Sequence, residues 1–281
     1  MITFINKNFK KVNSLNNLEI YCVTDKDLHY LKNLPCKLAG VGKSNFSKEY
    51  NLANTKDNID YKEKYYSELT FHYWLWKNKM KNLDRNTWVG FCQKRRFWIK
   101  KNISKNDVTT HNLKNYILSQ LPEEWKNYNS VICDPIYVNG VNKVKLLKRG
   151  FKSLIRDPEI FFNTKKQTVK LHFDMHHGYG NLDKAINLLD DSDRDEFRNY
   201  VENQVCFNPN IMFIAKKDIA NQWFEKLFPW LFRCEKIFSF ENLKGYDSQR
   251  LYAYLGERYL SFWFKKYSKY IEWPYITFSN I

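Results

Sequence analysis

Glycine and proline are scarce in this sequence, with 9 and 7 among 281 residues, which excludes collagen-like and low-complexity chains. No run of about 18 apolar residues occurs, so no helix that crosses a bilayer is predicted. The first residues, Met1 to Val12, lack the apolar segment of a secretory signal. The six cysteines are scattered and form no CxxC pair, which argues against a zinc ribbon or a disulfide framework. We therefore expect a cytoplasmic protein in a reducing environment.

The usual sequence signatures of several enzyme classes are also missing. There is no Walker A motif, GxGxxG, HExxH or GxSxG, so the enzyme classes that use them have no support. The segment Gly40–Lys43 is too short a pattern for a phosphate-binding loop. Asp191, Asp193 and Asp195 have a DxD spacing, but they lie within an acidic helical run. There they predict a solvated helix face rather than metal ligands.

Aromatic and basic residues, by contrast, are abundant. Aromatic side chains make up 17% of the sequence and hydrophobic ones 43%, which is typical of a globular protein. The formal net charge is +16, of which residues 1–110 carry +11, residues 111–180 carry +5 and residues 181–281 carry none. Because a basic surface concentrates polyanions, the expected partners are sugar-nucleotide diphosphates, lipid-linked phosphates, an anionic membrane surface or nucleic acid.

Short apolar runs alternate with helical patterns along the chain. Strands are predicted over residues 18–25, 88–92, 130–134 and 210–215, a long loop over 40–62, and helices over 65–78, 183–197, 218–238 and 248–267. This alternation predicts one α/β domain, 1–281, with a mostly parallel, Rossmann-like sheet flanked by helices and a helical C-terminal part. Ligands of such sheets bind beyond the carboxyl ends of the strands, here the loops after Asp25, Cys92 and Asp134.

The segment from Lys143 to Arg156 combines basic and apolar residues. Its apolar members recur at near-helical spacing and its cations occupy the opposite face: Val144, Leu147, Phe151, Leu154 and Ile155 against Lys145, Lys148, Arg149, Lys152 and Arg156. This pattern fits a helix that lies on an anionic membrane or along a phosphate backbone. It also fits an ordinary surface helix with a solvated basic face.

Three consecutive cations, Lys94, Arg95 and Arg96, follow one of the predicted strands. Arginine suits bidentate contact with phosphate, and a diphosphate leaving group needs its charge neutralised as its bond breaks. The same residues could instead form a basic surface turn in which one arginine makes a structural ion pair.

Two further groups could carry chemistry. Asp174 lies close in sequence to His176 and His177, so these residues could transfer a proton or bind a metal, or could belong to an ordinary hydrogen-bonded loop. Glu257 and Arg258 interrupt an apolar, aromatic helix. They are either a buried structural ion pair or the source of a catalytic base.

Several motifs of the chain resemble, in the same order, those of a bacterial glycosyltransferase-like family. That family is common in capsule and lipopolysaccharide gene clusters and was long filed as a domain of unknown function. Its elements DNIS-x-K-N, Y-C-E-L-T-x-x-Y-W-x-W-K-N and V-G-L-C-H-Y-R-R-Y are matched here by Asp57-Asn58 with Lys62, by Tyr66–Asn78 and by Val89–Phe97. Weaker matches follow at residues 210–214, 228–232 and 250–260. Together they span about residues 20–265.

The resemblance implies a GT-A-like fold and transfer of a sugar from a nucleotide donor. It makes residues 1–135 the nucleotide-sugar-binding half and residues 136–281 the acceptor-binding, helical half. The candidate donor-binding residues are Thr24, Asp57, Asn58, Lys62, Glu68, Trp76, Lys77, Asn78, Gln93, Arg95, Arg96 and Arg258. The candidate acceptor or metal ligands are His176 and His177, and the candidate catalytic bases are Asp174 and Glu257.

The sequence departs from the family pattern at one functional element. Where the family has C-H-Y-R-R, this chain has Gln93 in place of the histidine and Lys94 in place of the tyrosine. Glutamine keeps the capacity to hydrogen-bond but does not titrate near neutral pH. Dependence on a divalent metal is therefore open, and we expect lysine and arginine to neutralise the diphosphate.

Three hypotheses follow from the sequence. The leading one is a glycosyltransferase that moves a sugar from a nucleotide sugar, with a UDP-sugar as first choice, to a glycan or lipid-linked saccharide. It would act in the cytoplasm or as a peripheral protein at the inner membrane face. The second is a phage-type DNA glycosyltransferase that modifies a hydroxymethylated base. The third is a non-catalytic anion-binding module descended from such an enzyme.

Overall fold

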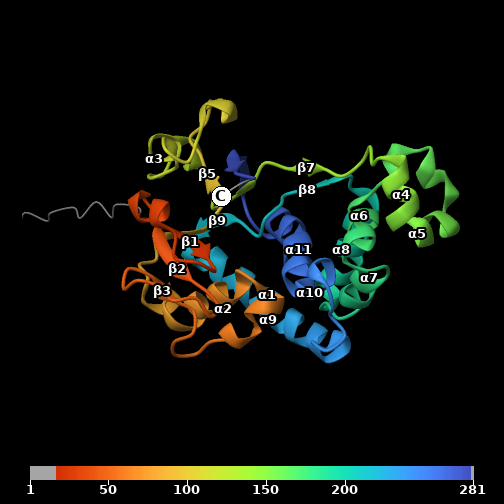
Figure 1. The fold of residues 1–281 in the computed structure, drawn as a ribbon, viewed down its shortest axis with the longest axis horizontal. Helices are drawn as coiled ribbons and strands as arrows, with labels where there is room; N and C mark the ends of the chain where they lie inside the picture. Colours follow the sequence, from red (N-terminus) through yellow and green to blue (C-terminus); the bar gives the residue numbers. More distant parts are fainter. Residues whose placement is uncertain (1–16, 280–281) are drawn as a thin grey trace, which may run out of the picture.

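The computed structural model describes residues 17–279, which fold around a nine-stranded sheet (Figure 1). The strand order along its main path is β10-β6-β9-β4-β1-β2-β3. β9 runs antiparallel to β4 and β6, whereas the pairs β4–β1, β1–β2, β2–β3 and β6–β10 are parallel. β5 pairs with β4 and β11 at one side of this path. The prediction of an α/β fold with a mostly parallel sheet is confirmed.

The strands are β1 Leu18–Thr24, β2 Lys37–Gly40, β3 Asn51–Leu52, β4 Trp88–Gln93, β5 Arg96–Trp98, β6 Ser130–Cys133, β7 Ile136–Tyr137, β8 Cys206–Phe207, β9 Phe213–Lys216, β10 Tyr270–Trp273 and β11 Tyr275–Thr277. The helices are α1 Glu63–Tyr66, α2 Leu69–Asn78, α3 Leu113–Tyr116, α4 Lys143–Arg149, α5 Phe151–Arg156, α6 Val169–His177, α7 Asn181–Ile186, α8 Asp191–Asn203, α9 Lys217–Phe238, α10 Tyr246–Gln249 and α11 Leu251–Tyr267.

All four predicted strands are present, as β1, β4, β6 and β9. The helix predicted over 183–197 is two helices, α7 and α8, and β3 lies within the predicted loop 40–62. In the described part of the chain, none of the helices has both the length and the apolar content needed to cross a membrane. Residues 1–12, on which the expectation about a secretory signal depends, lie outside the described residues.

β1 and β4 lie in the middle of the sheet and are buried on both faces. Along β1, Tyr21 and Val23 join the core shared with α2 and α9, whereas Ile20 and Cys22 join the core on the opposite face. Because successive side chains of a strand point to opposite faces, burial on both sides produces the uninterrupted apolar run seen in the sequence. Gly90 lets β4 approach β9 closely, since a Cβ atom there would lie 2.6 Å from a side-chain atom of β9.

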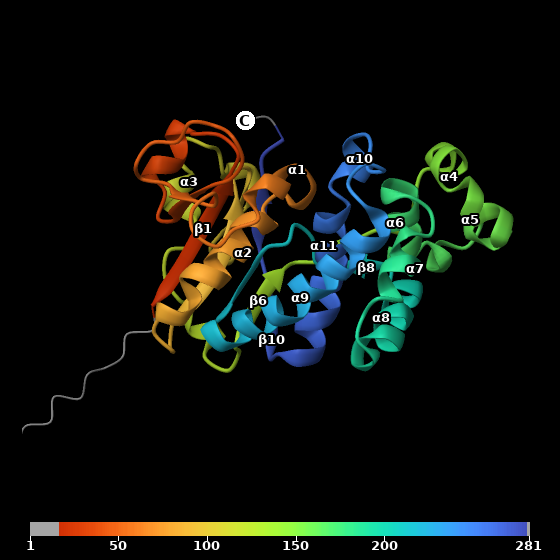
Figure 2. The same ribbon diagram turned by 90° about the horizontal axis from the view of Figure 1, so that it is seen from below.

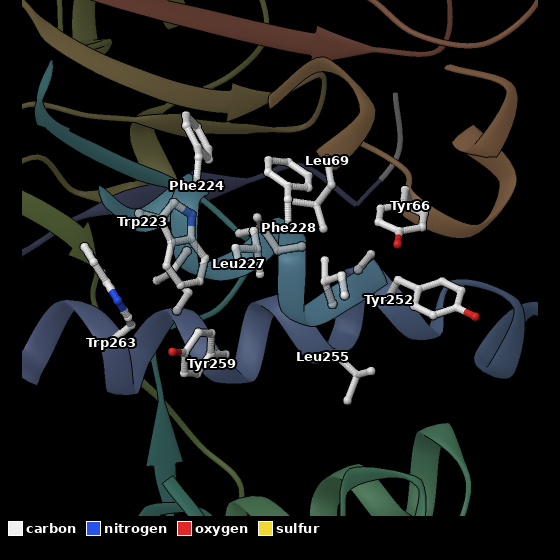
Figure 3. Close-up of a cluster of buried hydrophobic side chains, with 14 of the residues drawn as sticks. Tyr66, Leu69, Trp223, Phe224, Leu227, Phe228, Tyr252, Leu255, Tyr259 and Trp263 are labelled. Atoms are coloured by element: carbon white, nitrogen blue, oxygen red, sulfur yellow. The ribbon is translucent and has the colours of Figure 1, made fainter. Parts of the chain in front are cut away.

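α9 and α11 pack together beside the sheet through a large aromatic and aliphatic cluster (Figure 3). Its members recur every three or four residues on each helix, so they share one helix face: Trp223, Phe224, Leu227 and Phe228 on α9, and Tyr252, Leu255, Tyr259 and Trp263 on α11. The Trp223 ring lies 5.4 Å from Trp263 and 5.6 Å from Tyr259, measured between ring centroids. This packing holds α11, the carrier of Glu257 and Arg258, firmly against the rest of the fold.

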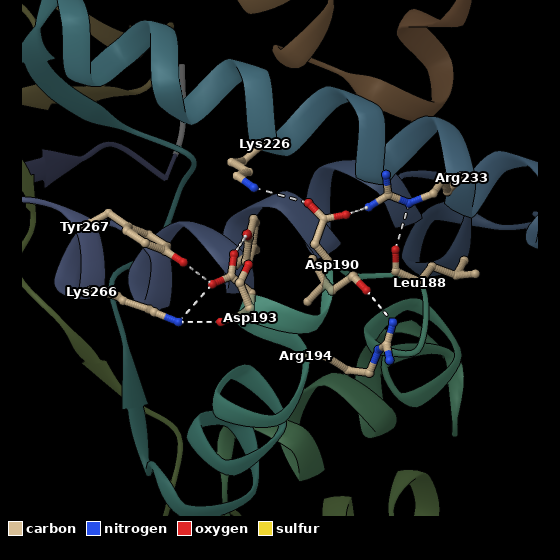
Figure 4. Close-up of polar contacts among 11 residues, drawn as sticks. Leu188, Asp190, Asp193, Arg194, Lys226, Arg233, Lys266 and Tyr267 are labelled. Carbon is tan, nitrogen blue, oxygen red and sulfur yellow. Dashed lines mark hydrogen bonds and ion pairs between the residues drawn. The ribbon is translucent and has the colours of Figure 1, made fainter.

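α6, α7 and α8 lie beyond α11 from the sheet, and α4 and α5 form the outer end of the molecule (Figure 2). Asp193 of α8 anchors this helical layer to α11 (Figure 4). It is 1% exposed and accepts hydrogen bonds from the hydroxyls of Tyr259 and Tyr267, both at 2.5 Å, and from Lys266 Nζ at 3.1 Å. The prediction that the whole DxD run is solvated is wrong for Asp193, because this residue faces α11 rather than water.

Candidate active site

A cavity of about 210 Å³ lies at the carboxyl ends of β1 and β4, where ligands of open α/β sheets bind. Six of the predicted site residues line it: Thr24, Glu68, Gln93, Arg95, Arg96 and Glu257. Its ionisable lining comprises four carboxylates and four cations: Asp25, Glu63, Glu68 and Glu257, and Lys94, Arg95, Arg96 and Arg250. The cavity therefore carries strong local charges of both signs with little net charge.

The cations at the end of β4 belong to a tight hairpin. Gln93 of β4 pairs with Arg96 of β5, so Lys94 and Arg95 form a two-residue tip that projects beyond the sheet edge. The carbonyl of Lys94 accepts a hydrogen bond from the Tyr30 hydroxyl, and the carbonyl of Arg95 accepts one from a backbone N–H in the C-terminal segment at 2.9 Å. The backbone that presents these cations to the cavity is thus held on both sides.

Thr24 and Asp25 form the corresponding end of β1. The Thr24 hydroxyl donates to the carbonyl of Lys26 at 2.8 Å and accepts the Lys26 N–H at 3.1 Å, which turns the chain out of the sheet. Asp25 forms an ion pair with Lys94. Burial acts to raise the pKa of Asp25, but the hydrogen bond and charge of Lys94 outweigh it and lower that pKa below its ordinary value.

Gln93 connects the hairpin to the turn that precedes β9. Its Nε2 donates to the carbonyl of Asn210 at 2.6 Å, and its Oε1 accepts a hydrogen bond from Arg96 Nη1. Asn210 and Ile211 both have positive φ angles, 82° and 51°. A left-handed conformation is costly for a β-branched residue, and such strain concentrates at functional sites. The strained turn forms part of the cavity wall.

Glu257 and Arg258 form the opposite wall and the layer behind it. Glu257 Oε1 accepts the Asn210 N–H at 2.6 Å, and its other carboxylate oxygen accepts a hydrogen bond from Arg258. Arg258 is 1% exposed, lies 3.8 Å from the centroid of the Phe207 ring and donates to His172 Nδ1 at 3.0 Å. Burial lowers the pKa of Arg258, opposed by the charge of Glu257. The predicted donor residue Arg258 thus contacts Glu257 but does not line the cavity.

Glu63 and Arg250 also line the cavity, although neither was among the predicted site residues. Burial raises the pKa of Glu63; the charge of Arg250 opposes this rise and the carboxylates of Asp25 and Glu68 add to it. Glu63 is therefore more readily protonated than an ordinary glutamate. The sequence held a signal for Arg250, which begins the last motif of the family resemblance, but none for Glu63.

Five predicted donor-binding residues, in the loop after β3 and on α2, instead contact other parts of the fold. Asn78 Nδ2 donates to the carbonyl of Asp57 at 2.7 Å, and the N–H of Asp57 donates back to Asn78 Oδ1 at 3.3 Å. Asn58 Oδ1 accepts the N–H two residues later at 3.2 Å. Trp76 Nε1 donates to an asparagine of α9 at 3.0 Å, and the ammonium of Lys77 lies 3.7 Å from the centroid of the Trp76 ring. None of the five lines the cavity.

Lys62 is also outside the cavity. Its Nζ lies 2.7 and 2.8 Å from the two carboxylate oxygens of Glu235 on α9, and the Tyr66 hydroxyl donates to the same carboxylate at 2.5 Å. The Lys62 side chain is 11% exposed and that of Glu235 19%. This nearly buried pair ties the segment before α1 to α9.

Asp174, His176 and His177 lie on α6, behind α11, and do not line the cavity. Asp174 accepts hydrogen bonds from Lys170 Nζ at 2.8 Å and from the Gly180 N–H at 3.0 Å. Burial raises the pKa of Asp174, opposed by Lys170. His177 is buried, and burial followed by the charge of Arg258 lowers its pKa to about 3, so it is neutral at physiological pH.

No group of three or more His, Cys, Asp or Glu side chains within residues 17–279 is arranged to hold a metal ion. His176 Nδ1 lies 3.0 Å from Arg149 Nη1, and His177 Nδ1 lies 3.0 Å from a carbonyl of α10. One ring nitrogen of each predicted metal ligand is thus engaged by the protein. The role of these histidines as acceptor or metal ligands stays a prediction.

Comparison with known proteins shows the family. Residues 19–269 match a family described as a domain of unknown function, DUF4422. The chain belongs to this family. This result agrees with the resemblance to a glycosyltransferase-like family, although the correspondence of individual motifs is not tested by it.

A solved structure supplies the fold relationship of this DUF4422 chain. It is described as the apo structure of the WbbM bifunctional glycosyltransferase, and the similarity has a TM-score of 0.67 at 19% sequence identity. The match covers 94% of this chain and 46% of that one, so the chain spans about half the length of its structural relative. No curated protein matches the sequence. At this identity the similarity shows a shared fold.

Proposed function

We propose that this chain is a glycosyltransferase with a GT-A-like fold. It would transfer a sugar from a nucleotide sugar, with a UDP-sugar as the first choice, to a hydroxyl group of a glycan or lipid-linked saccharide. The observation that carries the proposal is the cavity at the ends of β1 and β4, lined by Arg95, Arg96 and Glu257. The fold shared with a structure described as a glycosyltransferase supports the same reading.

The cations suit the leaving group of such a reaction. When the bond between the anomeric carbon and the diphosphate breaks, its electron pair stays on the phosphate oxygen and negative charge develops there. Arginine side chains donate to phosphate in a bidentate geometry, and preorganised donors stabilise developing charge. In our proposal Arg95 and Arg96 hold the diphosphate, while Lys94, paired with Asp25, contributes a further positive charge.

If the reaction inverts the configuration at the anomeric carbon, a carboxylate accepts the proton of the acceptor hydroxyl as its oxygen bonds to that carbon. Of the two catalytic candidates from the sequence, Glu257 lines the cavity and Asp174 does not. We therefore propose Glu257 as the base. Its hydrogen bonds to the Asn210 N–H and to Arg258 fix the orientation of the carboxylate. Glu63 faces the same space and is the second carboxylate to test.

The decisive experiment measures binding and turnover of UDP- and GDP-sugars by calorimetry and by product analysis, with and without a chelator of divalent metals. Removal of the cation in Arg96→Met should weaken binding of the nucleotide diphosphate about tenfold to a hundredfold, as expected for lost charge-assisted hydrogen bonds. Turnover should fall by orders of magnitude, because the developing charge then lacks a partner.

The matched control is Arg85→Met. The Arg85 side chain is 87% exposed and pairs with Asp218 at 3.6 Å, outside the cavity. This variant should bind nucleotide sugars like the wild type. Absence of binding across the whole donor panel, or equal losses in the Arg85 and Arg96 variants, would contradict the proposal.

DNA is a second candidate acceptor, because the net charge of +16 favours phosphate-rich partners. A gel shift on duplex DNA at increasing salt distinguishes it: binding to DNA weakens steeply with salt when several phosphate contacts are made. Any measured sugar transfer would contradict the third hypothesis, a non-catalytic anion-binding module.

A further inference from the structure

Residues 143–166 form a small helical lobe, which we call the basic lobe. It comprises α4, α5 and a 3₁₀ turn at Pro158–Phe161, and it lies at the end of the molecule away from the sheet (Figures 1 and 2). It contains eight lysine and arginine residues against two acidic ones, a net charge of +6. The basic lobe is therefore among the parts of the molecule that would concentrate anions most strongly.

The inner face of the lobe packs on α6 through few residues. Leu146 is fully buried and joins Leu171 and Met175 of α6 in a small separate core. Gly150 lies between α4 and α5, and a Cβ atom there would lie 3.5 Å from the side chain of Met175 on α6. The contact with the rest of the protein thus uses the face that carries Leu146 and Gly150.

The outer face is the apolar one. Val144, Leu147, Phe151 and Ile155 are 58, 50, 59 and 67% exposed, and they follow one another at intervals of three or four residues. Val144 and Leu147 thus share one side of α4, and Phe151 and Ile155 share one side of α5. The sequence left open an ordinary surface helix, which would turn its apolar face inward. The structure instead leaves four of the five predicted apolar side chains exposed, whereas Leu154 packs against the small core; Phe162, 81% exposed, adds to the exposed group.

Cations flank this apolar face, and the two acidic residues of the lobe do not oppose them. Lys145, Lys148 and Lys152 are exposed. Asp157 and Glu159 both form ion pairs with Lys166, each at 2.8 Å, so this lysine offsets part of their charge, and the lobe as a whole keeps its net charge of +6. The remaining surface combines exposed aliphatic side chains with positive charge.

We propose that the basic lobe docks on an anionic lipid surface. The apolar side chains would enter the boundary between headgroups and acyl chains, while the lysines bind the lipid phosphates. Nucleic acid would satisfy the cations but not Val144, Leu147 and Ile155, because aliphatic side chains do not stack on bases. The apolar face therefore favours a lipid surface over a phosphate backbone as the partner.

This proposal goes beyond the proposed transferase activity and does not depend on it. In Figure 2, α4 and α10 lie toward the same side of the molecule. Arg250, which follows α10, lines the cavity. If both proposals hold, docking of the basic lobe would therefore bring the cavity close to an acceptor carried on a lipid. Vesicle binding and nucleotide-sugar binding are measured separately, so failure of one leaves the other interpretable.

The test is flotation of the full chain with vesicles of phosphatidylcholine alone and of phosphatidylcholine mixed with phosphatidylglycerol. We expect binding to the mixed vesicles that weakens with salt, and little binding to the neutral ones. The variant Lys148→Gln/Lys152→Gln should bind mixed vesicles about thirtyfold more weakly, given the contribution of each lysine near an anionic surface. The variant Leu147→Gln/Phe151→Gln should lose at least about tenfold, because its apolar contact is removed.

Two control variants match these changes elsewhere. Ile237→Gln alters an apolar residue of α9 that is 56% exposed, and Lys114→Gln/Lys126→Gln removes two exposed lysines outside the lobe. Both should bind vesicles like the wild type, and all variants should keep the wild-type melting temperature. Equal losses in the control and lobe variants, or no binding to mixed vesicles at low salt, would overturn the proposal. So would binding to duplex DNA without vesicle binding, or a dimer that only the lobe variants abolish.

Discussion

The pair formed by Glu257 and Arg258 allows a stability measurement that needs no substrate. The Arg258 side chain is 1% exposed, and its hydrogen bonds go to Glu257 and His172. Loss of one member of a buried ion pair costs about 3–5 kcal/mol, since the remaining charge has no partner. We expect Glu257→Gln to lower the free energy of unfolding by about 4 kcal/mol, because it leaves the buried guanidinium with only neutral partners.

Removal of the guanidinium in Arg258→Met should lower the free energy of unfolding by a smaller amount. In Arg258→Met the carboxylate of Glu257 is 16% exposed toward the cavity and keeps the Asn210 N–H at 2.6 Å, so we expect a loss of about 2 kcal/mol. The double variant contains neither charge and should also lose only about 2 kcal/mol. The two substitutions are thus strongly non-additive in a double-mutant cycle.

The assay is urea unfolding of the wild type, both single variants and the double variant, followed by fluorescence and circular dichroism. The control is the same cycle on the surface pair Asp157 and Lys166, where we expect much weaker coupling because solvent screens the two charges. If the double variant loses the sum of the two single losses, the carboxylate and the guanidinium are not coupled. Arg258 would then not orient Glu257 at the cavity.

Two further predictions concern buried residues outside the cavity. Burial lowers the pKa of His72 to about 3, so between pH 7 and pH 5 the unfolded chain takes up a proton that the folded chain does not. Stability should fall over this range by about 2 kcal/mol from His72 alone, and His72→Phe should remove that part of the pH dependence of urea unfolding. Lys62→Met should lower stability by about 3 kcal/mol, since it leaves Glu235 nearly buried and unneutralised, while binding of UDP stays unchanged. If a stable Lys62 variant binds UDP more weakly than the wild type, this prediction is wrong and Lys62 belongs to the donor site.

The sequence identified the central strands because both of their faces are buried. In β1 the alternate residues Tyr21 and Cys22 enter different cores, and the resulting continuous apolar run is a local signal. β10, Tyr270–Trp273, gives no such signal, because it contains a glutamate and three of its four residues are only partly buried. Its strand conformation depends on pairing with β6, more than a hundred residues earlier, and this contact is not encoded locally.

The site was predictable where topology decides it and not where hydrogen bonding decides it. The rule that ligands bind at strand ends led to Thr24 and to the 93–96 hairpin, and these residues line the cavity. The motif residues Asp57 and Asn78 are equally polar, but the Asn78 amide bonds to the Asp57 backbone, and the Asp57 carboxylate accepts a hydrogen bond from the Tyr73 hydroxyl at 3.3 Å. A sequence does not tell whether an amide or carboxylate will hydrogen-bond within the protein or remain available to a ligand, because that depends on partners distant along the chain.

Gln93, at which the sequence resemblance predicts a histidine, has a physical role in the cavity wall. A chain of hydrogen bonds begins at Arg258, which donates to Glu257, and Glu257 accepts the backbone N–H of Asn210. It continues from the carbonyl of Asn210 to the amide of Gln93, which also bonds to Arg96. Gln93 fits because one atom of its amide must donate and the other must accept, and a neutral histidine could do the same with its two ring nitrogens. Glutamine makes this connection without a group that titrates near pH 6.5.

This chain of hydrogen bonds also explains how the strained turn persists. Left-handed backbone at Asn210 and Ile211 costs of the order of 1–3 kcal/mol for each residue. Hydrogen bonds from Gln93 to the Asn210 carbonyl and from the Asn210 N–H to Glu257 hold both sides of that residue and offset the cost. A wall fixed in this way before a ligand arrives loses little conformational entropy on binding. The presence of Gln93 where the sequence resemblance predicts a histidine is therefore not in itself an argument for a non-catalytic module.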